Sequence, residues 1–245
     1  MLPKTALLLL GMCLFIAMST AYAQDGETDK PRFGLRFGLE MGTFYNSRLA
    51  GMGNVLRQLN VDTRAVGPLP ANGVMSLVMD GNRVTSELRY VTPFSFHEDT
   101  PPAPTSAERR ARFYGYGVGG SFTLKLINTR RFIVGPTLGY DLVWYRLDLL
   151  PVEQKNVAIG SVVNNPTGYV VNTLKQNVNQ NLQIGLSGEL RIHWQREIRL
   201  GTRLGYQLPV GTSARWSLND GYVGDLPAFR ANMLYGQLSG TLFWW

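Results

Sequence analysis

One stretch of the chain, residues 181–194 with the sequence NLQIGLSGELRIHW, alternates strictly between two kinds of side chain. Its odd positions are polar or glycine. Its even positions, apart from Gly188, are large and apolar: Leu182, Ile184, Leu186, Leu190, Ile192 and Trp194. Successive side chains of a β-strand point to opposite faces, so a period of two residues indicates a strand. The stretch predicts a long strand with one apolar and one polar face.

The same alternation recurs in segments near residues 32–45, 83–94, 112–126, 131–145, 198–208 and 232–245. Residues 73–79 are apolar on both faces and form the first arm of a hairpin whose turn is Asp80-Gly81-Asn82. This makes about eight strands. Short connections at 81–82, 128–130 and 195–197 alternate with long ones at 46–71, 95–110, 150–177 and 211–229. Within the first long connection, LAGMGNVLRQLN could form a short helix, which its two glycines disfavour. Pro136 lies inside a predicted strand, where it suggests a bulge. We expect one antiparallel, up-and-down all-β domain over residues 32–245.

The first 23 residues have the pattern of a secretory signal peptide: Lys4, an apolar run from Ala6 to Met18, and the cleavage site Ala21-Tyr22-Ala23. Residues 24–31 follow as a polar leader. The single cysteine, Cys13, lies inside the signal, so the mature chain would have no thiol chemistry and no disulfide. No later apolar run approaches the length of a transmembrane helix. An exported chain of this kind can still span a bilayer as a closed β-barrel.

The polar face of the predicted strands is charged and rich in glycine. A soluble barrel would turn its apolar face inward, whereas a membrane barrel turns that face to lipid. Glycine weakens a solvated strand, but it makes room inside a narrow barrel. We therefore expect the polar face to line a filled lumen, with an ion network formed by Arg36, Glu40, Glu87, Arg89, Lys125, Asp141, Glu189, Arg191, His193, Arg199 and Arg203. Cations outnumber carboxylates in this set, and a narrow anion path is the alternative.

Aromatic residues collect at the strand ends, where membrane barrels carry interfacial girdles. The expected interface aromatics are Tyr90, Phe132, Trp144, Trp194, Trp244 and Trp245. The strands are longer than the roughly 9–11 residues that cross hydrocarbon, so they should project from the bilayer on the side of the long connections.

With its export signal, strand count, turn–loop alternation and terminal Trp244-Trp245, the chain resembles small outer-membrane β-barrels of Gram-negative bacteria, of the OmpA/OmpX type. The resemblance implies an eight-stranded antiparallel up-and-down transmembrane barrel in the cell outer membrane, with both termini in the periplasm and four long loops outside. It also implies recognition of the C-terminal strand by the barrel assembly machinery. One departure concerns the last residue, which family members keep in phase with the lipid-facing row. Here Trp244, not Trp245, continues the row of Leu234, Leu238 and Leu242.

Chemistry-bearing motifs are few. His97, in His97-Glu98-Asp99, is a weak catalytic candidate, and an outer-membrane lipid A deacylase is the enzymatic alternative, although the His-x-Ser pattern of those enzymes is absent. No phosphate-binding loop, dinucleotide fingerprint or metal-ligand spacing is present, so we expect no cofactor and no metal. The formal net charge of +7 indicates anionic partners. Because the chain is exported, these would be outer-membrane lipids and lipopolysaccharide rather than nucleic acid, met through loop arginines such as Arg48, Arg57, Arg64, Arg109, Arg110 and Arg215. A surface or periplasmic protein partner and a soluble periplasmic ligand-binding barrel remain further alternatives.

Overall fold

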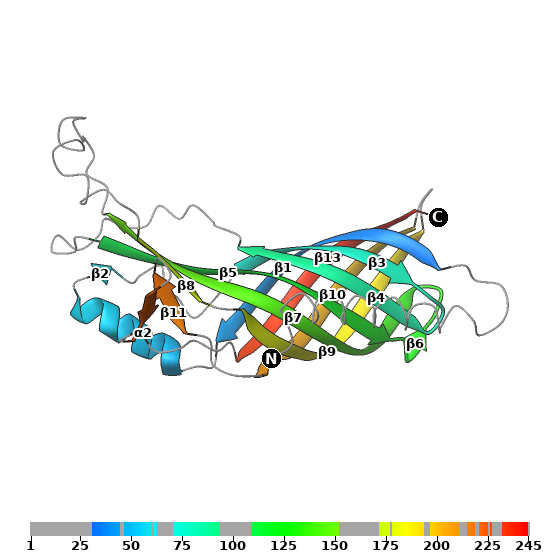
Figure 1. Cartoon of the computed structure of the whole chain (residues 1–245). Coiled ribbons are helices and arrows are strands. Elements are labelled where there is room, and N and C mark those ends of the chain that lie inside the picture. The colour runs from blue at the N-terminus through cyan, green and yellow to red at the C-terminus, as the bar shows by residue number, and fades with distance from the viewer. Residues whose placement is uncertain are drawn as a thin grey trace, which may run out of the picture.

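A closed barrel forms most of the molecule (Figure 1). The computed structural model describes residues 31–44, 47–59, 61–62, 71–93, 109–151, 172–176, 178–193, 197–210, 215–218, 221–224, 226 and 232–244. Eight strands form the barrel wall: β1 (Arg32–Phe44), β3 (Ala71–Asp80), β4 (Val84–Pro93), β5 (Arg109–Leu124), β7 (Phe132–Pro151), β9 (Asn179–His193), β10 (Glu197–Val210) and β13 (Met233–Trp244). Each strand pairs antiparallel with the next in this order, and β13 closes the ring on β1. The predicted eight-stranded up-and-down barrel is confirmed.

The outside of the barrel is apolar and the inside is polar. Large apolar side chains stand at least half exposed on the outer wall, among them Phe37, Leu77, Leu138, Leu186, Leu204 and Leu238. An apolar surface of this extent does not suit water, whereas it matches the lipid-facing band of a membrane barrel. The structure is therefore an integral membrane barrel, and the inward-facing apolar wall of a soluble carrier is absent from the described strands. Among the described residues, no helix is both long and apolar enough to cross a membrane.

The two ends of the barrel differ. At the turn end, short connections join β3 to β4, β5 to β7 and β9 to β10, and the two-residue strand β6 (Ile127–Asn128) pairs with the start of β7. Pro136 pairs with Leu186 of β9 without any break in register. On the other side of β7, one extra residue lies between the pairs Thr123↔Thr137 and Ile127↔Val134. The irregularity suggested by Pro136 thus lies in the neighbouring strand, at residues 124–126.

At the loop end, β5 and β7 continue beyond the barrel and support a second folded unit, which we call the head. They have 16 and 20 residues. The pairing of β5 with β4 ends at Gly117, and the pairing of β7 with β9 ends at Val143. The head consists of residues 109–116 of β5 and 144–151 of β7, together with α2 (Ser47–Gln58), β2 (Val61–Asp62), β8 (Asn172–Gln176), β11 (Trp216–Leu218) and β12 (Gly221–Val223). These short elements come from segments that the sequence analysis treated as long loops.

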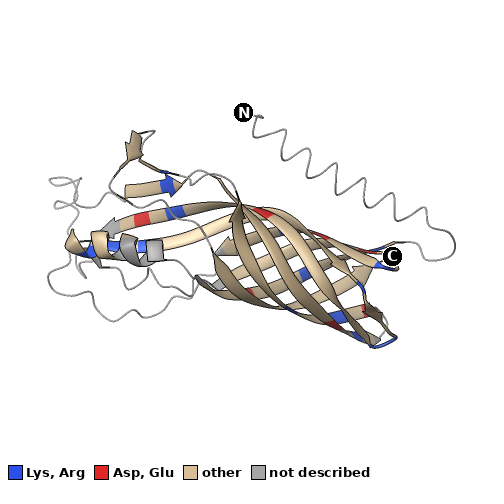
Figure 2. Cartoon of the chain, turned by 90° about the horizontal axis from the view of Figure 1, so that it is seen from below, with Lys and Arg blue, Asp and Glu red and all other residues tan. Residues whose placement is uncertain are grey.

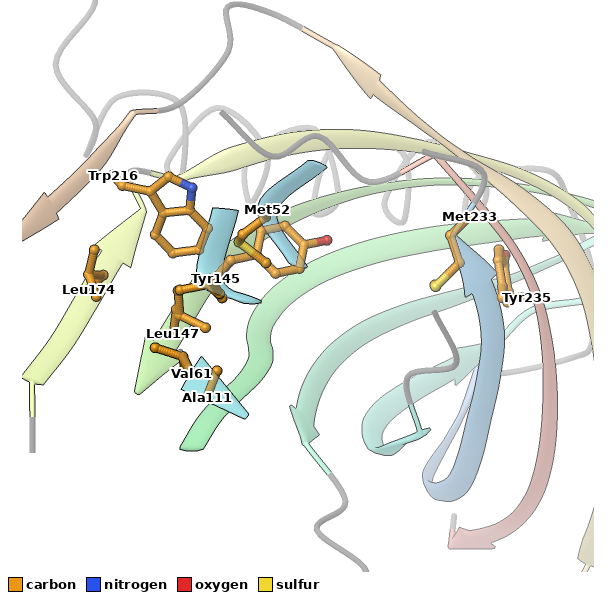
Figure 3. Close-up of a cluster of buried hydrophobic side chains, with 10 residues drawn as sticks. Met52, Val61, Ala111, Tyr145, Leu147, Leu174, Trp216, Met233 and Tyr235 are labelled. Carbon is orange, nitrogen blue, oxygen red and sulfur yellow. The ribbon is translucent and has the colours of Figure 1, made fainter. Parts of the chain in front are cut away.

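The head has a hydrophobic core, and Met233 and Tyr235 of the barrel strand β13 belong to the same cluster (Figure 3). Met52 and Leu56 lie four residues apart on α2, hence on one face of the helix, and both are buried. They pack in one cluster with Tyr145 and Leu147 of β7 and with Trp216 of β11. Phe113 stacks on Tyr145 with ring centroids 5.5 Å apart and meets Trp216 edge-on at 6.4 Å. Burial of this face explains why α2 forms in spite of its glycines, since tertiary packing supplies most helix stability.

The apolar positions change face along β5 and β7 where the barrel ends. In the barrel their even-numbered residues, such as Val118 and Leu138, face outward, and the odd-numbered ones line the lumen. In the head the odd-numbered residues Phe113, Tyr145 and Leu147 form the core, and the even-numbered ones, apart from Leu150, are polar or aromatic. The strand register stays continuous through this change. The apolar residues therefore move from even to odd positions in the sequence, while successive side chains continue to alternate between the two faces of the sheet.

Candidate functional site

The middle of the lumen holds an ion network that crosses the barrel. Arg36 of β1 donates to Glu87 of β4 at 2.6 Å and also to Glu189 of β9, while its Nε donates to Thr241 at 2.8 Å. Arg203 of β10 donates to the other oxygen of Glu87, which also accepts from Ser121 at 2.8 Å. β4 and β10 lie on opposite sides of the ring, four strands apart. The Arg203–Glu87 pair therefore spans the whole lumen.

A second group lies toward the loop end. Arg89 of β4 donates to Glu40 of β1 at 2.8 Å and to Gln183 of β9 at 3.0 Å. Its Nε is 3.6 Å from Asp141 of β7, and Gln183 donates to the same aspartate. The Tyr235 hydroxyl completes the group at 3.4 Å from Gln183. These contacts join strands from several sides of the barrel at one level.

A third group closes the turn end. Arg199 of β10 donates to Asp80 of β3 at 2.5 Å and to Glu197 at 2.7 Å, and its guanidinium lies 4.3 Å from the centre of the Phe243 ring. Lys125 approaches Asp80 to 2.7 Å. Arg191 is at the rim, half-buried, and donates to the Thr129 carbonyl and to Asn128, both at 2.8 Å.

Charge in the lumen is balanced. Among the described residues of the lumen, the buried cations are Arg36, Arg89, Lys125, Arg199 and Arg203, and the buried carboxylates are Glu40, Asp80, Glu87, Asp141 and Glu189. The sequence analysis placed Asp80 in a turn and expected six cations, Arg191 among them, against four carboxylates. In the structure β3 extends through Asp80, whose side chain points inward against Arg199 and Lys125. Asp80 adds a fifth carboxylate and Arg191 lies at the rim, so five buried cations face five buried carboxylates.

The lumen glycines make room for bulky neighbours. A β-carbon at Gly205 would lie 2.7 Å from the Tyr235 hydroxyl oxygen, and one at Gly42 would lie 2.6 Å from the Met233 sulfur. Tyr235 and Met233 are both buried. The sequence analysis expected glycine to make room inside a narrow barrel lined by charged residues. At these positions they accommodate an aromatic ring and a thioether, which fill the lumen between the ion groups and the head.

Three of the aromatics expected at the membrane interface are exposed on the outer wall. Tyr90 faces outward on β4, and Phe132 and Trp244 do so near the turn end. Trp144 is half-buried and stacks on Tyr116 of β5, with ring centroids 5.8 Å apart, at the point where the head begins. Trp244 lies in the outward row with Leu242, as its sequence phase indicated.

Several expected positions cannot be compared with the structure. His97, Trp194 and Trp245 lie outside the described residues, and the side chain of His193 does as well. The described residues contain no group of three or more His, Cys, Asp or Glu side chains that could hold a metal ion. The lumen carboxylates are instead held by arginine, lysine, hydroxyl and amide groups.

The head presents a face that the sequence analysis did not identify. Rows of paired residues cross its strands: Tyr114 pairs with Arg146, Arg146 with Lys175, Lys175 with Ser217, and Ser217 with Tyr222. Residues in register on neighbouring strands point to the same side of a sheet. This side is opposite the core, because the alternate residues Tyr145, Leu174 and Trp216 are buried under α2. We call it the open face of the head.

Polar contacts on the open face centre on Asp148. It accepts from the Tyr114 hydroxyl at 2.9 Å, from Arg146 at 3.0 Å and from Thr173 at 2.7 Å. The guanidinium groups of Arg112 and Arg146 each lie 5.7 Å from the centre of the Tyr114 ring. Partial burial and the hydrogen bond to Asp148 raise the pKa of Tyr114 to about 12. Tyr114 therefore remains a neutral donor at physiological pH.

No protein-family model matches this chain, and no curated protein sequence matches it. Solved structures do. Neisserial surface protein A is 12% identical, with 88% of this chain and 98% of that one covered and a TM-score of 0.42. A major outer membrane protein from Thermus thermophilus is 12% identical, with coverage of 88% and 100% and a TM-score of 0.46. The outer membrane protease OmpT from Escherichia coli is 8% identical, with coverage of 87% and 94% and a TM-score of 0.31. At these identities the similarity concerns the fold alone.

Proposed function

We propose that this chain is an outer-membrane protein whose filled barrel anchors a folded, positively charged head at the cell surface, and that the head is the part that meets a partner. The apolar outer wall and the N-terminal signal pattern support the membrane assignment. The orientation follows the resemblance to small outer-membrane barrels, in which the long connections lie outside. In the same orientation β13 would be the segment read by the barrel assembly machinery.

The lumen is proposed to be closed to ions. Its salt bridges join strands on opposite sides, so a permeating ion would have to separate Arg203 from Glu87 and Arg199 from Asp80. Breaking a buried ion pair leaves an uncompensated charge, which costs about 3–5 kcal/mol. An eight-stranded barrel is also just wide enough for its own side chains. Structural filling explains the charged residues without transport.

The observation that carries the proposal is the hydrophobic phase change along β5 and β7. A barrel that served only as a membrane plug would not need strands that leave the bilayer and build a second core. In this chain Tyr145, Leu147 and Trp216 form that core with α2. The head is thus a folded surface held at a defined height and angle above the membrane, which is what recognition of a surface partner requires.

Two measurements test this proposal. Single-channel recordings on the refolded protein in planar bilayers should show no stable conductance; a steady open level would contradict the closed lumen. A Tyr222→Cys variant places the only cysteine of the mature chain on the exposed head, where Tyr222 is 70% exposed. A membrane-impermeant maleimide should label it in intact cells. An Arg131→Cys variant, exposed at the turn end, is the matched control and should label only after the outer membrane is permeabilised. The reverse labelling pattern would show that the head faces the periplasm.

A further inference from the structure

Basic residues outnumber acidic ones in the described part of the head. The described residues of the head include eight basic positions, Arg48, Arg57, Arg109, Arg110, Arg112, Arg146, Lys175 and Arg215, and two acidic ones, Asp62 and Asp148. Figure 2 shows both charge signs on the barrel strands and mainly blue segments in the head. Because the lumen is neutral, the positive net charge of the chain must be sought outside it. The head is therefore a major site of attraction for anions.

The open face of the head combines these cations with aromatic rings. Tyr114, Tyr116, Trp144 and Tyr222 share the face with Arg112, Arg146 and Lys175, and Arg215 precedes Ser217 by two residues, which places it in the same alternation. Asp148 is engaged by Tyr114, Arg146 and Thr173. Within the described part of the chain, Arg112, Lys175 and Arg215 are exposed and have no carboxylate partner. Their charge is available to a ligand.

The position of the open face specifies which anions it meets. Even-numbered residues of β5 and β7 form the lipid-facing wall in the barrel and the open face in the head, without a break in register. The stacked pair Tyr116–Trp144 lies between the two zones, as expected of residues at a membrane interface. The cations Arg112, Arg146 and Lys175 follow within a few residues of this pair. They are therefore placed at the height of the lipid headgroups next to the barrel wall.

A headgroup that suits this face must carry phosphate and also present flat apolar surfaces. Guanidinium and ammonium groups bind phosphate oxygens through charge-assisted hydrogen bonds. Exposed tyrosine and tryptophan rings supply rigid, amphipathic contact area for a ring-shaped ligand. A phosphorylated saccharide offers both features, whereas a simple phosphodiester headgroup offers only the charge.

We propose that the open face of the head, through Arg112, Lys175 and Arg215 around the Tyr114–Arg146 pair, binds the phosphorylated saccharide headgroup of a glycolipid in the adjoining membrane leaflet. The proposal rests on the proposed function in one respect, because such glycolipids occupy the outer leaflet and the head must be on that side. It adds the chemical class of the partner and the residues that recognise it.

The test compares two triple variants that remove the same charge at opposite ends of the barrel. One is Arg112→Gln, Lys175→Gln and Arg215→Gln on the open face. The matched control is Arg83→Gln, Arg130→Gln and Arg131→Gln, three exposed residues at the turn end. Each purified, refolded protein is titrated with deep-rough lipopolysaccharide in detergent, and bound lipid is counted by native mass spectrometry. Both variants must retain heat-modifiable gel migration, which shows that the barrel is folded.

The open-face variant should bind this lipopolysaccharide roughly 100-fold more weakly than the parent protein, about fivefold for each cation removed near a lipid surface. The control variant should bind like the parent. Equal loss in both variants, or no loss in either, would overturn the proposal.

Two further probes separate phosphate from saccharide recognition. Enzymatically dephosphorylated lipopolysaccharide and phosphatidylglycerol should both bind the parent protein more weakly than intact lipopolysaccharide. Phosphatidylglycerol binding as tight as that of lipopolysaccharide would overturn the saccharide part. If these binding tests fail but a maleimide labels Tyr222→Cys in intact cells, the glycolipid proposal is overturned and the proposed function stands. If Tyr222→Cys is not labelled in intact cells, both proposals are overturned.

Discussion

The barrel and the head are built from the same strands, yet they follow opposite rules of burial. In the barrel, ten charged side chains are buried and the leucines of the outer wall are exposed. In the head, Leu147, Leu174 and Trp216 are buried, and Arg112 and Lys175 are exposed. The backbone does not distinguish the two zones, because β5 and β7 run through both in one register. The difference reflects the solvent, which is hydrocarbon around the barrel and water around the head.

This comparison also separates two ways of stabilising a core. The lumen is held by ion pairs with specific mutual partners, in which the loss of one member leaves another charge buried. The head core is held by apolar packing, in which the loss of a side chain leaves a cavity. Single substitutions should therefore have different signatures in the two regions.

The largest effect is expected for Glu87→Ala in the lumen. Glu87 accepts from Arg36, Arg203 and Ser121, so its removal takes from Arg203 the carboxylate that it pairs with and leaves Arg36 with Glu189 alone. The free energy of unfolding should fall by about 3–5 kcal/mol, measured by urea denaturation of the barrel refolded into lipid vesicles. Arg32→Ala is the matched control, since Arg32 is half-exposed and pairs with Glu197 at the rim. It should cost less than about 1 kcal/mol. Equal effects would show that the lumen pairs are hydrated and weak.

Trp216→Ala should disrupt the head while the barrel remains folded. Trp216 is fully buried against Phe113 and the core of the head. A truncation of this kind costs about 3–5 kcal/mol, which a unit this small should not withstand. We expect rapid proteolysis within the head and unchanged heat-modifiable migration of the barrel. Ser217→Ala, on the adjacent position of the open face, should behave like the parent. Simultaneous loss of the barrel would show that the two regions fold as one unit.

Leu204→Arg tests the difference in solvent directly. Leu204 is 69% exposed on the barrel wall and Leu59 is 68% exposed at the end of α2, so their exposure alone does not separate them. An arginine on the lipid face should cost about 2–4 kcal/mol if it lies near the bilayer midplane. Leu59→Arg should change the free energy of unfolding by less than about 0.5 kcal/mol, as is usual at a water-exposed site. Equal costs in vesicle unfolding experiments would contradict the membrane boundary drawn between barrel and head.

The smallest effect concerns pH. The pKa of Tyr114 is raised from 10.0 to about 12, by partial burial and then by the hydrogen bond to Asp148. Because the pKa is higher in the folded state, Tyr114 contributes its full stabilisation at pH values below the unfolded pKa of 10.0. This contribution is lost as the pH rises from 10.0 through about 12. Tyrosinate absorbance of the folded protein, taken as the difference between the parent and Tyr114→Phe, should show one phenol titrating near pH 12. A difference curve centred at pH 10.0 would mean that Tyr114 does not make the bond to Asp148.

Much of the barrel could be predicted from sequence because its determinants are local. Alternation in stretches such as residues 181–194 specifies both strand and face, and one slipped residue would put Arg191 into the apolar row. Asp80 was misplaced for a local reason: it precedes Gly81 and Asn82, which signal a turn. Only its pairing with Thr85 of β4 and Arg32 of β1 shows that the strand includes it. The head carried a readable signal as well, since apolar residues move from even to odd positions between Leu142 and Leu147. Its meaning depends on partners that are distant in sequence.

The sequence by itself determined the export signal pattern, the strand periodicity and the two opposite faces, because these depend on neighbouring residues and on the solvent that each face requires. Only the tertiary structure decided which charges pair, because Arg203 and Glu87 are distant in the chain and meet only when the ring closes. It also decided that α2, β8 and β11 assemble on the ends of β5 and β7. None of these short elements can bury its apolar side alone. Their conformation follows from the shared core, to which the ends of β5 and β7 contribute.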